Sequence, residues 1–447
     1  MSDISAGSQI FDLIFHPSHS TVYTALLSGK VKAFAYDQEG RNKQVLSIRV
    51  SHKSCRGLTI NEDGTRIYAV GKGKCLHTID TETGKIVETR AKAHDVAINR
   101  VKNVTSWLLS TGDDDGVVKL WDPRKKDAVR KYTQHFDYIT DFLWLEDKKQ
   151  LVATSGDGTL SVMDVRARTT EPFAQSEDQE DELLSIAPIK GVDHGHNADW
   201  DFLSSATKFL VGTQLGILSV FNRSSGWGDC VDRIPGHPQS IDALCSLPAT
   251  LPNVDCTSTI LSGSSDGFVR AVGVFPTKLH GVVADHGEWP VERIAVGEGM
   301  SQLTLDLEEG VEEKSVSSAR QKSEELDDDA RPPGNFWAGS AGHDALLKLT
   351  NLEVFFSGQA SRLGADERED SGEDEHIEEA SPSRNLGRLP ASDVGDKGSD
   401  SDSDDPDPEP ELSGRRKRKK KEKDPLASKR KRGKNELEVE GAFFGEL

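Results

Sequence analysis

The 447-residue chain carries a formal net charge of −20, and only 35% of its residues are hydrophobic. This acidity argues against a face of the protein coated with nucleic acid, because carboxylates repel phosphates. No run approaches the roughly 20 apolar residues of a membrane helix, and the acidic N-terminus is unlike a signal peptide. The five cysteines form no CxxC pair. We therefore expect an intracellular protein with free thiols and no membrane contact.

Glycines that would close tight turns recur along the chain at a nearly constant interval. The first three steps of the series are 44, 43 and 42 residues, and the turn positions are Gly29, Gly73, Gly116, Gly158, Gly216 and Gly267, with Ala345 in a seventh copy. A period of about 40–45 residues is typical of β-propeller blades of four strands. Seven copies predict an all-β, seven-bladed WD-repeat β-propeller over residues 1–357, and we expect it to be monomeric.

Each copy shows three clear strand patterns and a weaker outer one. The first blade contains FDLIFHP, TVYTALL and KVKAFAYD, in which apolar residues alternate or run continuously as in buried strands. In the seventh blade, an acidic insertion at residues 297–334 separates VERIAVG from FWAGSAG and LLKLTNL. The strand that closes the ring is open to two interpretations. The sequence favours LEVFF (Leu352–Phe356), and residues near Ile4–Gln9 are the alternative.

Two polar loops interrupt the blade period. Thr169–Glu182 is acidic and joins the fourth blade to the fifth, and Asp193–Asp201 (DHGHNADWD) interrupts the fifth. The second loop holds His194 and His196 among aspartates, but a His-x-His pair without a second anchored ligand pair is weak evidence for a metal. We expect solvated loops, with no metal and no cofactor.

The third blade carries the fullest WD motif, Trp121–Asp122. Asp115 stands six residues before the tryptophan, and we predict that it bonds His94, with Thr111 completing a buried network that rigidifies the blade. Such a set is structural rather than catalytic, and we expect no enzyme. Equivalent turn acids are Asp157, Asp266 and Asp344, with His135 and His237 upstream of the first two. Other residues stand at the tryptophan position of the remaining blades: Phe34, Ile79, Met163, Phe221, Val272 and Thr350.

The C-terminal part divides by composition. Residues 358–413 are acidic and too poor in apolar residues to fold, residues 414–434 are basic, and residues 435–447 return to hydrophobicity. Dense lysine and arginine predict nuclear and nucleolar targeting through an import receptor, with non-specific RNA contact as a further expectation. The targeting residues are Arg415, Arg416, Lys417, Arg418, Lys419, Lys420, Lys421, Lys429, Arg430, Lys431 and Arg432. Phe443 and Phe444 predict a docking motif for a partner groove or for the propeller itself.

Taken together, FDLIFHP, DDGVVKLWDPR, SGDGTLSVMDVR, PVERIAV, GHDALLKL and the basic tail ending in AFFGEL resemble the WD repeat-containing protein 55 family, whose fungal members are JIP-type proteins. The resemblance implies a nucleolar β-propeller associated with ribosome biogenesis and ribosomal RNA processing. Pre-ribosomal assembly factors are the partners it implies. The alternative function is a substrate-receptor module of a ubiquitin ligase or a chromatin-associated reader, since propellers serve many roles.

Overall fold

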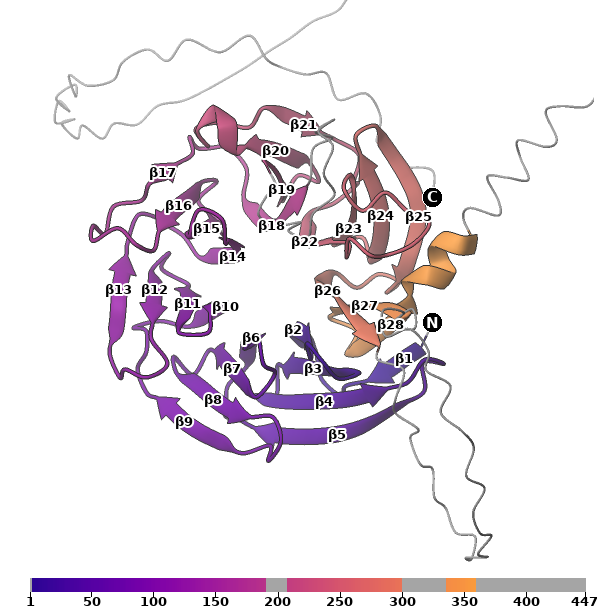
Figure 1. Ribbon diagram of the computed structural model, residues 1–447, viewed down its shortest axis with the longest axis horizontal. Helices are drawn as coiled ribbons and strands as arrows, with labels where there is room; N and C mark the ends of the chain where they lie inside the picture. Colours follow the sequence, from indigo (N-terminus) through magenta and orange to yellow (C-terminus); the bar gives the residue numbers. More distant parts are fainter. Residues whose placement is uncertain (1, 190–206, 300–334, 359–447) are drawn as a thin grey trace, which may run out of the picture. The chain divides into compact units, whose positions relative to one another are not determined.

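The structure is a ring of seven four-stranded antiparallel sheets around a central channel (Figure 1). This computed structural model describes residues 2–189, 207–299 and 335–358. Within them, the seven-bladed all-β propeller predicted from the turn spacing is confirmed. The predicted metal-like loop at residues 193–201, most of the acidic insertion and the tail beyond residue 358 lie outside the described residues.

Each blade meanders outward from the channel, so its inner strand comes first in the sequence. Blades 1 to 3 consist of β2 (Ile10–Phe15), β3 (Thr21–Leu26), β4 (Lys30–Tyr36) and β5 (Asn42–Arg49); β6 (Cys55–Ile60), β7 (Arg66–Gly71), β8 (Leu76–Asp80) and β9 (Ile86–Arg90); and β10 (Ile98–Thr105), β11 (Leu108–Asp113), β12 (Val118–Trp121) and β13 (Ala128–Tyr132).

Blades 4 to 6 repeat this order, and blade 5 adds a short 3₁₀ helix, η1 (Arg223–Ser225). Their strands are β14 (Ile139–Leu145), β15 (Gln150–Ser155), β16 (Leu160–Asp164) and β17 (Ala174–Gln175); β18 (Leu183–Ile189), β19 (Lys208–Thr213), β20 (Leu218–Asn222) and β21 (Asp232–Ile234); and β22 (Ile241–Ser246), β23 (Thr259–Ser264), β24 (Phe268–Val274) and β25 (Thr277–Asp285). The expected acidic loop Thr169–Glu182 therefore contains the outer strand of blade 4.

The seventh blade is closed by the N-terminus. Its sheet runs from β26 (Val291–Gly299) through β27 (Asn335–Gly342) and β28 (Leu346–Asn351) to β1 (Ser2–Ser5). Ser2 lies opposite Leu349 and Ser5 opposite Leu346 in an antiparallel register. The favoured prediction, that Leu352–Phe356 supplies this strand, is wrong. Because β1 and β28 are neighbours in one sheet (Figure 1), backbone hydrogen bonds link the first and last strands of the propeller.

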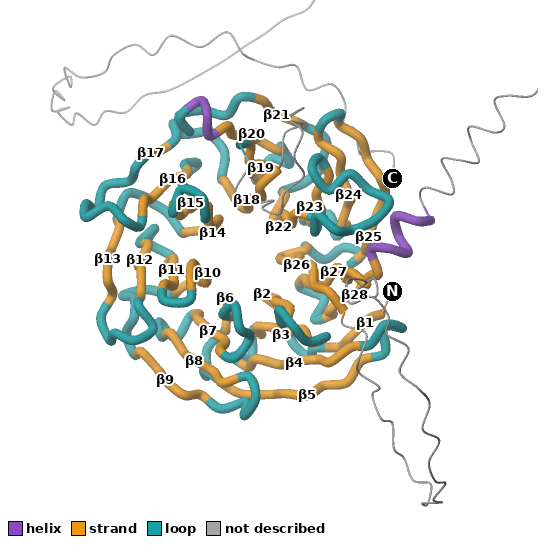
Figure 2. The backbone as a smooth tube through the Cα atoms, in the orientation of Figure 1, coloured by secondary structure: helices purple, strands orange, loops and turns teal. Residues whose placement is uncertain are grey.

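Residues 352–358 are helical instead of extended, and Figure 2 shows this segment in purple at the side of the ring. The side chain of Asn351 accepts a hydrogen bond from the Val354 amide at 3.1 Å, which satisfies a free donor at the helix start. Leu352 and Phe356, four residues apart, are both buried in the core between blades 6 and 7. Side chains four residues apart lie on the same side of a helix, so this helix can bury both against the ring.

The predicted turn positions carry the left-handed backbone that favours glycine. The φ angle is +73° at Gly29 and +75° at Gly116. A β-carbon at Gly29 would collide with the carbonyl oxygens of Ser51 and Lys53. In blade 2 the alignment is off by one residue, because Lys74 (φ +63°), not Gly73, has this conformation; in blade 7 Ala345 (φ +59°) adopts it as expected from the alignment.

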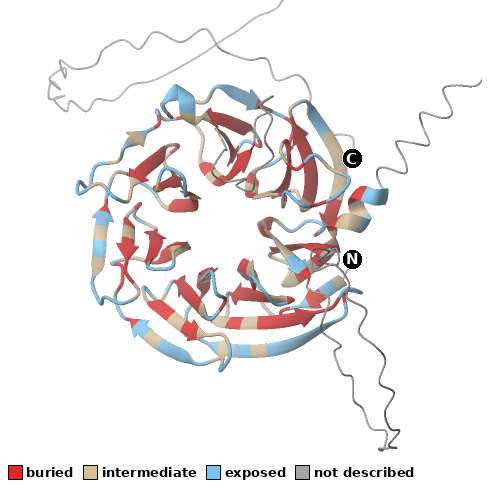
Figure 3. Cartoon of the chain, in the orientation of Figure 1, coloured by how far each residue is buried: buried red, intermediate tan, exposed pale blue. Residues whose placement is uncertain are grey.

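The hydrophobic core is divided among the spaces between neighbouring blades (Figure 3). Between blades 3 and 4, for example, Leu120 of β12 packs with Phe142 of β14 and Met163 of β16. Met163 lies opposite Leu151 in blade 4, just as Trp121 lies opposite Leu109 in blade 3. Thus Met163 fills in blade 4 the position that tryptophan holds in blade 3. The five cysteines are free, and no helix among the described residues is long and apolar enough to cross a membrane.

Candidate functional site: the mouth of the central channel

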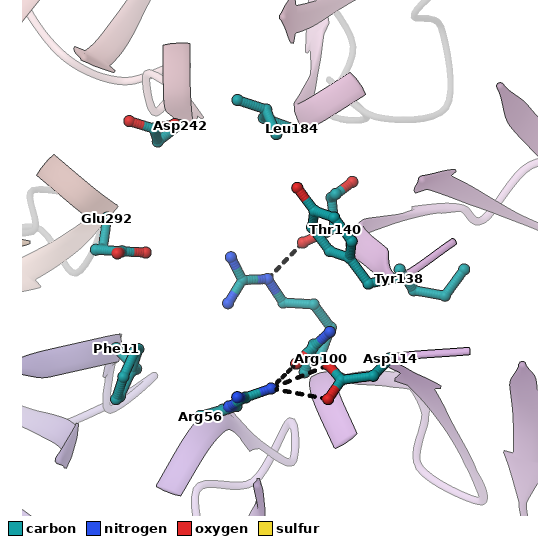
Figure 4. A pocket seen from close by; sticks show the side chains of 11 residues that line it. Phe11, Arg56, Arg100, Asp114, Tyr138, Thr140, Leu184, Asp242 and Glu292 are labelled. Atoms are coloured by element: carbon teal, nitrogen blue, oxygen red, sulfur yellow. Dashed lines mark hydrogen bonds and ion pairs between the residues drawn. The ribbon is translucent and has the colours of Figure 1, made fainter. Parts of the chain in front are cut away.

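The seven inner strands all run in the same direction along the channel, so the propeller has two chemically distinct faces. We call the face where these strands begin the start face and the opposite one the end face. A cavity of about 330 Å³ opens at the start face and is lined by the first residues of the inner strands and the loops before them, including Phe11, Arg56, Arg100, Tyr138 and Glu292. This cavity is the mouth of the channel (Figure 4).

Two arginines approach the mouth from neighbouring blades. Arg56 is neutralised by Asp114 at 3.0 Å and also donates to the side-chain oxygen of Asn99 at 2.6 Å. Arg100 donates its Nε proton to the carbonyl oxygen of Thr140 in the next blade. Its two terminal nitrogens point into the open middle of the mouth (Figure 4). Arg100 therefore offers hydrogen-bond donors to anything that enters.

Acidic groups face these arginines from blades 6 and 7. Glu292 accepts a hydrogen bond from the Nε2 of His343 at 2.5 Å. Burial acts to raise the pKa of Glu292, but the bond from His343 and the charge of Arg100 lower it overall. Burial raises the pKa of Asp242, although Ser265 and Ser240 donate hydrogen bonds to its carboxylate. The mouth thus presents donors on one side and acceptors on the other.

A further arginine, Arg293 of β26, forms a bridge across the channel beneath the mouth. Its Nε lies 3.1 Å from Asp12 of blade 1, and its Nη2 lies 3.0 Å from Asp141 of blade 4. Burial acts against the charge, but the two aspartates raise the pKa of Arg293. The residues that directly precede Asp12, Asp141 and Arg293 in the sequence line the mouth. Asp12, Asp141 and Arg293 themselves line a larger cavity of about 600 Å³ toward the end face. The bridge therefore separates the two cavities.

Large apolar side chains are exposed on loops of the start face. Phe136 precedes the inner strand of blade 4 and is 90% exposed, and Trp289, which precedes that of blade 7, is 53% exposed. Leu27 and Leu215 are exposed at the turns between the second and third strands of blades 1 and 5. These four side chains come from four different blades and leave apolar area exposed at the loops of the start face.

Buried hydrogen bonds join the predicted network residues of blade 3, with one correction. His94 bonds Asp113 through Nδ1 at 2.6 Å and Thr111 through Nε2 at 2.6 Å, and the Trp121 indole donates to the same Thr111 hydroxyl at 2.8 Å. The prediction that Asp115 bonds His94 is wrong. Asp113 ends β11 in the interior, while Asp115 is exposed at the tip of the turn. Burial lowers the pKa of His94, although the bond to Asp113 acts in the opposite direction.

The equivalent positions of other blades differ in their partners. His135 lies 3.1 Å from Asp157 and 2.7 Å from the hydroxyl of Ser161. His286 lies 2.7 Å from Asp344, which the sequence had placed at this turn without its histidine. A histidine a few residues before the inner strand, as His94, His135 and His237 stand in blades 3, 4 and 6, is the signal that could have found His286.

Blade 6 departs further from the predicted pattern. Asp266 accepts two hydrogen bonds from Arg270, at 3.0 and 2.7 Å. His237 forms a hydrogen bond with the hydroxyl of Ser262 at 2.9 Å. Burial, with the charge of Arg270 adding to it, lowers the pKa of His237 to about 4. Both side chains of the ion pair are almost completely buried.

These His, Asp and hydroxyl groups cannot act on a substrate where they lie. The His94 and Asp113 side chains are 0% and 3% exposed, and the Thr111 hydroxyl is engaged by His94 and Trp121. A nucleophile must reach a reacting atom at about 3 Å. Among the described residues, no group of three His, Cys, Asp or Glu side chains could hold a metal ion.

Comparison with known proteins places the chain. A family model described as WDR55 matches residues 1–304. The chain belongs to the WDR55 family. The WD repeat-containing protein JIP5 of Laccaria bicolor is 53% identical to it over 466 aligned residues that cover both chains completely. WD repeat-containing protein 55 of Arabidopsis thaliana is 30% identical over 81% of this chain and 86% of its own. The bovine protein of the same name is 35% identical over 66% of this chain and 71% of its own.

The WDR55-family resemblance noted from the sequence motifs is thereby confirmed. The targeting cations of residues 415–421 and 429–432 and the pair Phe443–Phe444 lie outside the described residues. The Arg293 bridge had no sequence signal, because its partners stand 281 and 152 residues away.

Proposed function

We propose that this WDR55-family protein is a non-catalytic scaffold that binds other proteins on the start face of its propeller. The observation that carries this proposal is the combination of exposed apolar loops, Phe136 and Trp289 among them, with the polar mouth that holds Arg100. Apolar anchors supply most of the binding energy of a protein interface, and hydrogen-bonding groups between them fix its orientation. The rigid ring holds both in fixed positions.

We further propose that the scaffold serves ribosome biogenesis and ribosomal RNA processing in the nucleolus, with pre-ribosomal assembly factors as its partners. The family resemblance and the two basic runs of the tail support this assignment. Depletion of the protein should change the levels of ribosomal RNA precursors, measured by hybridisation with probes to the spacer regions. Unchanged precursor levels after complete depletion would contradict the assignment.

The same experiment is paired with a purification of the full-length protein and mass spectrometry of the proteins bound to it. Pre-ribosomal factors are the expected result. Ubiquitin-ligase adaptors or histones as the main partners would instead support a substrate receptor or a chromatin reader, and would overturn the assignment to ribosome biogenesis.

The location is tested through the two basic runs. Changing the cations of residues 415–421 and 429–432 to glutamine should disperse the protein into the cytoplasm, because clustered cations are the chain's recognisable import signal. Changing the first run alone should weaken nuclear entry less. Nucleolar accumulation of the doubly changed protein would show that a partner of the propeller carries it there.

A further inference from the structure

The end face of the propeller carries a basic strip across blades 3, 4 and 5, in a chain whose net charge is −20. Its cations come from the outer strand of blade 3, from the loops of blade 4 after β14 and β16, and from η1 of blade 5. We define the basic strip as Arg130, Lys148, Lys149, Arg166, Arg168 and Arg223. The corresponding loops of blade 2 carry acids instead, such as Glu62, Asp63 and Glu82.

Hydrogen bonds and an ion pair hold the loops of the basic strip together. Arg130 donates from blade 3 to the carbonyl oxygen of Val165 in blade 4 at 3.3 Å. The Val165 amide in turn donates to the carbonyl oxygen of Lys149 at 3.1 Å. Arg223 of blade 5 pairs with Asp147, next to Lys148, at 2.8 Å. The segments of three blades that carry these cations are therefore linked to one another, and we call them the track.

Several charges on this track have no neutralising partner. Arg166 pairs with Asp164 and Arg223 with Asp147. Lys148 and Arg168 are exposed, and neither forms an ion pair with a carboxylate of the described residues. Lys149 also pairs with Glu146, so the unpaired positive charge of the strip comes chiefly from Lys148 and Arg168. Exposed cations without a partner favour a polyanion.

An aromatic cleft lies at one end of the basic strip. It has a volume of about 430 Å³ and is lined by Lys148, Phe173, Arg223, Ser224 and the loop that follows. The Phe173 ring is 66% exposed, although it stands in a polar loop. The cleft is also lined by Trp227, which is buried and stacked on Phe209 with ring centroids 4.8 Å apart. An exposed ring beside two cations, in a cleft of this size, fits a nucleobase and its phosphate.

We propose that the basic strip and the aromatic cleft bind single-stranded RNA, with one base stacked on Phe173 and the backbone following the strip past Lys148 and Arg168. An acidic peptide would match the charges but would leave the aromatic ring without a planar partner. The 2′-hydroxyl of RNA gives Ser224 a hydrogen-bond partner that DNA lacks. This activity belongs to the end face and does not depend on protein binding at the start face.

The test uses the full-length chain with the tail cations of residues 415–421 and 429–432 changed to glutamine, so that the tail does not mask the propeller. The probe is a fluorescein-labelled 12-nucleotide single-stranded RNA of mixed sequence, followed by fluorescence anisotropy from 50 to 200 mM salt. Lys148→Glu with Arg168→Glu is the strip variant. Lys43→Glu with Lys85→Glu, on exposed positions of blades 1 and 2, is the control with the same change of charge.

The strip variant should bind the RNA about tenfold more weakly at 100 mM salt, and the control variant should bind almost as well as its parent. The salt dependence should also change. Losing two phosphate contacts should lower the slope of log affinity against log salt by about 1.4. The two variants should have the same melting temperature, since all four side chains are solvent-accessible.

Phe173→Ala tests the cleft without changing any charge. It should weaken binding about tenfold and leave the salt slope unchanged, because stacking does not release counterions. Phe173→Tyr, which keeps a ring, should restore binding. Ultraviolet crosslinking to an RNA that contains 4-thiouridine should label Phe173 or the peptide around it.

Two results would overturn the proposal. Equal weakening by the strip and control variants would show that only bulk charge matters. Strip-dependent binding of a peptide with the sequence of residues 399–411, together with weak RNA binding that Phe173→Ala does not change, would identify an acidic protein segment as the occupant.

Discussion

Blades 3 and 6 bury a histidine at the same point of the repeat but provide different partners for it. In blade 3, His94 holds both Asp113 and the Thr111 hydroxyl. In blade 6, His237 bonds Ser262, while the turn acid Asp266 is taken by Arg270. The repeat therefore fixes where the buried histidine lies, but not which side chains form hydrogen bonds with it.

The third strands of the two blades carry different cations. Lys119 lies opposite Thr111 in blade 3, and Arg270 lies opposite Ser262 in blade 6, so the two cations occupy one register position. Lys119 donates to the carbonyl oxygen of Ala93 at 2.7 Å and leaves Asp113 to the histidine. The longer, forked Arg270 reaches the turn and binds Asp266 with two nitrogens. The acid also stands at a different position, because Asp113 lies opposite Ile98 of its inner strand, where blade 6 has Ser264 opposite Ile241.

The largest expected effect is in blade 6. Asp266→Ala would leave the buried guanidinium of Arg270, whose side chain is 2% exposed, without its carboxylate. Removing one partner of a buried ion pair costs about 3–5 kcal/mol of the free energy of unfolding. Urea unfolding followed by tryptophan fluorescence measures this cost. Adding Arg270→Leu to Asp266→Ala should recover much of the loss. No recovery would mean that the charge is not the cause.

The pH dependence of stability should also come from blade 6. His237 keeps a pKa near 4 in the folded protein, against 6.5 when exposed. Neutral His237 thus contributes stability that is fully present above pH 6.5 and is lost as the pH falls toward 4, by about 3 kcal/mol in total. His237→Gln should reduce the slope of unfolding free energy against pH in this window. An unchanged slope would contradict the assignment.

A smaller effect is expected in blade 3. Asp113→Ala removes the carboxylate that forms a hydrogen bond with His94. It also removes the acceptor for the amides of Asp115 and Val117 in the turn. Leaving the buried His94 ring without this partner, and the two amides without their acceptor, should cost about 1–3 kcal/mol. Thermal unfolding of the variant measures the loss. A melting temperature equal to that of the parent would show that the network contributes nothing.

The smallest effect is expected at the neighbouring turn acid. Asp115→Ala changes an exposed side chain, so the free energy of unfolding should change by less than about 0.5 kcal/mol. This pair of variants separates the observed network from the one predicted by the six-residue spacing to Trp121. A loss at Asp115 as large as that at Asp113 would restore the predicted arrangement.

The sequence predicts those features that depend on local patterns. Turn positions such as Gly116 and Gly158 and the alternating strands require only neighbouring residues, and both were found. The N-terminal closure was only the alternative prediction, near Ile4–Gln9, because Ser2–Ser5 pairs with a strand more than 340 residues later and no local pattern shows this. Asp113 and Asp115 could not be separated, because both stand in one acidic turn and only burial distinguishes them.

The candidate surfaces were harder still to predict. The channel bridge of Arg293 joins blades far apart in sequence. Net acidity also concealed the basic strip, because total charge says nothing of how Lys148 and Arg168 are placed relative to the acids.

The central claim is that the polar interior maintains the fold and the start face binds the partners. The direct test is quantitative mass spectrometry of proteins that co-purify with full-length variants. Phe136→Ser with Leu215→Ser should lose partners about tenfold or more at an unchanged melting temperature. Val45→Ser with Val87→Ser, exposed on the outer strands, should retain them. Equal partner recovery from both variants would contradict the claim.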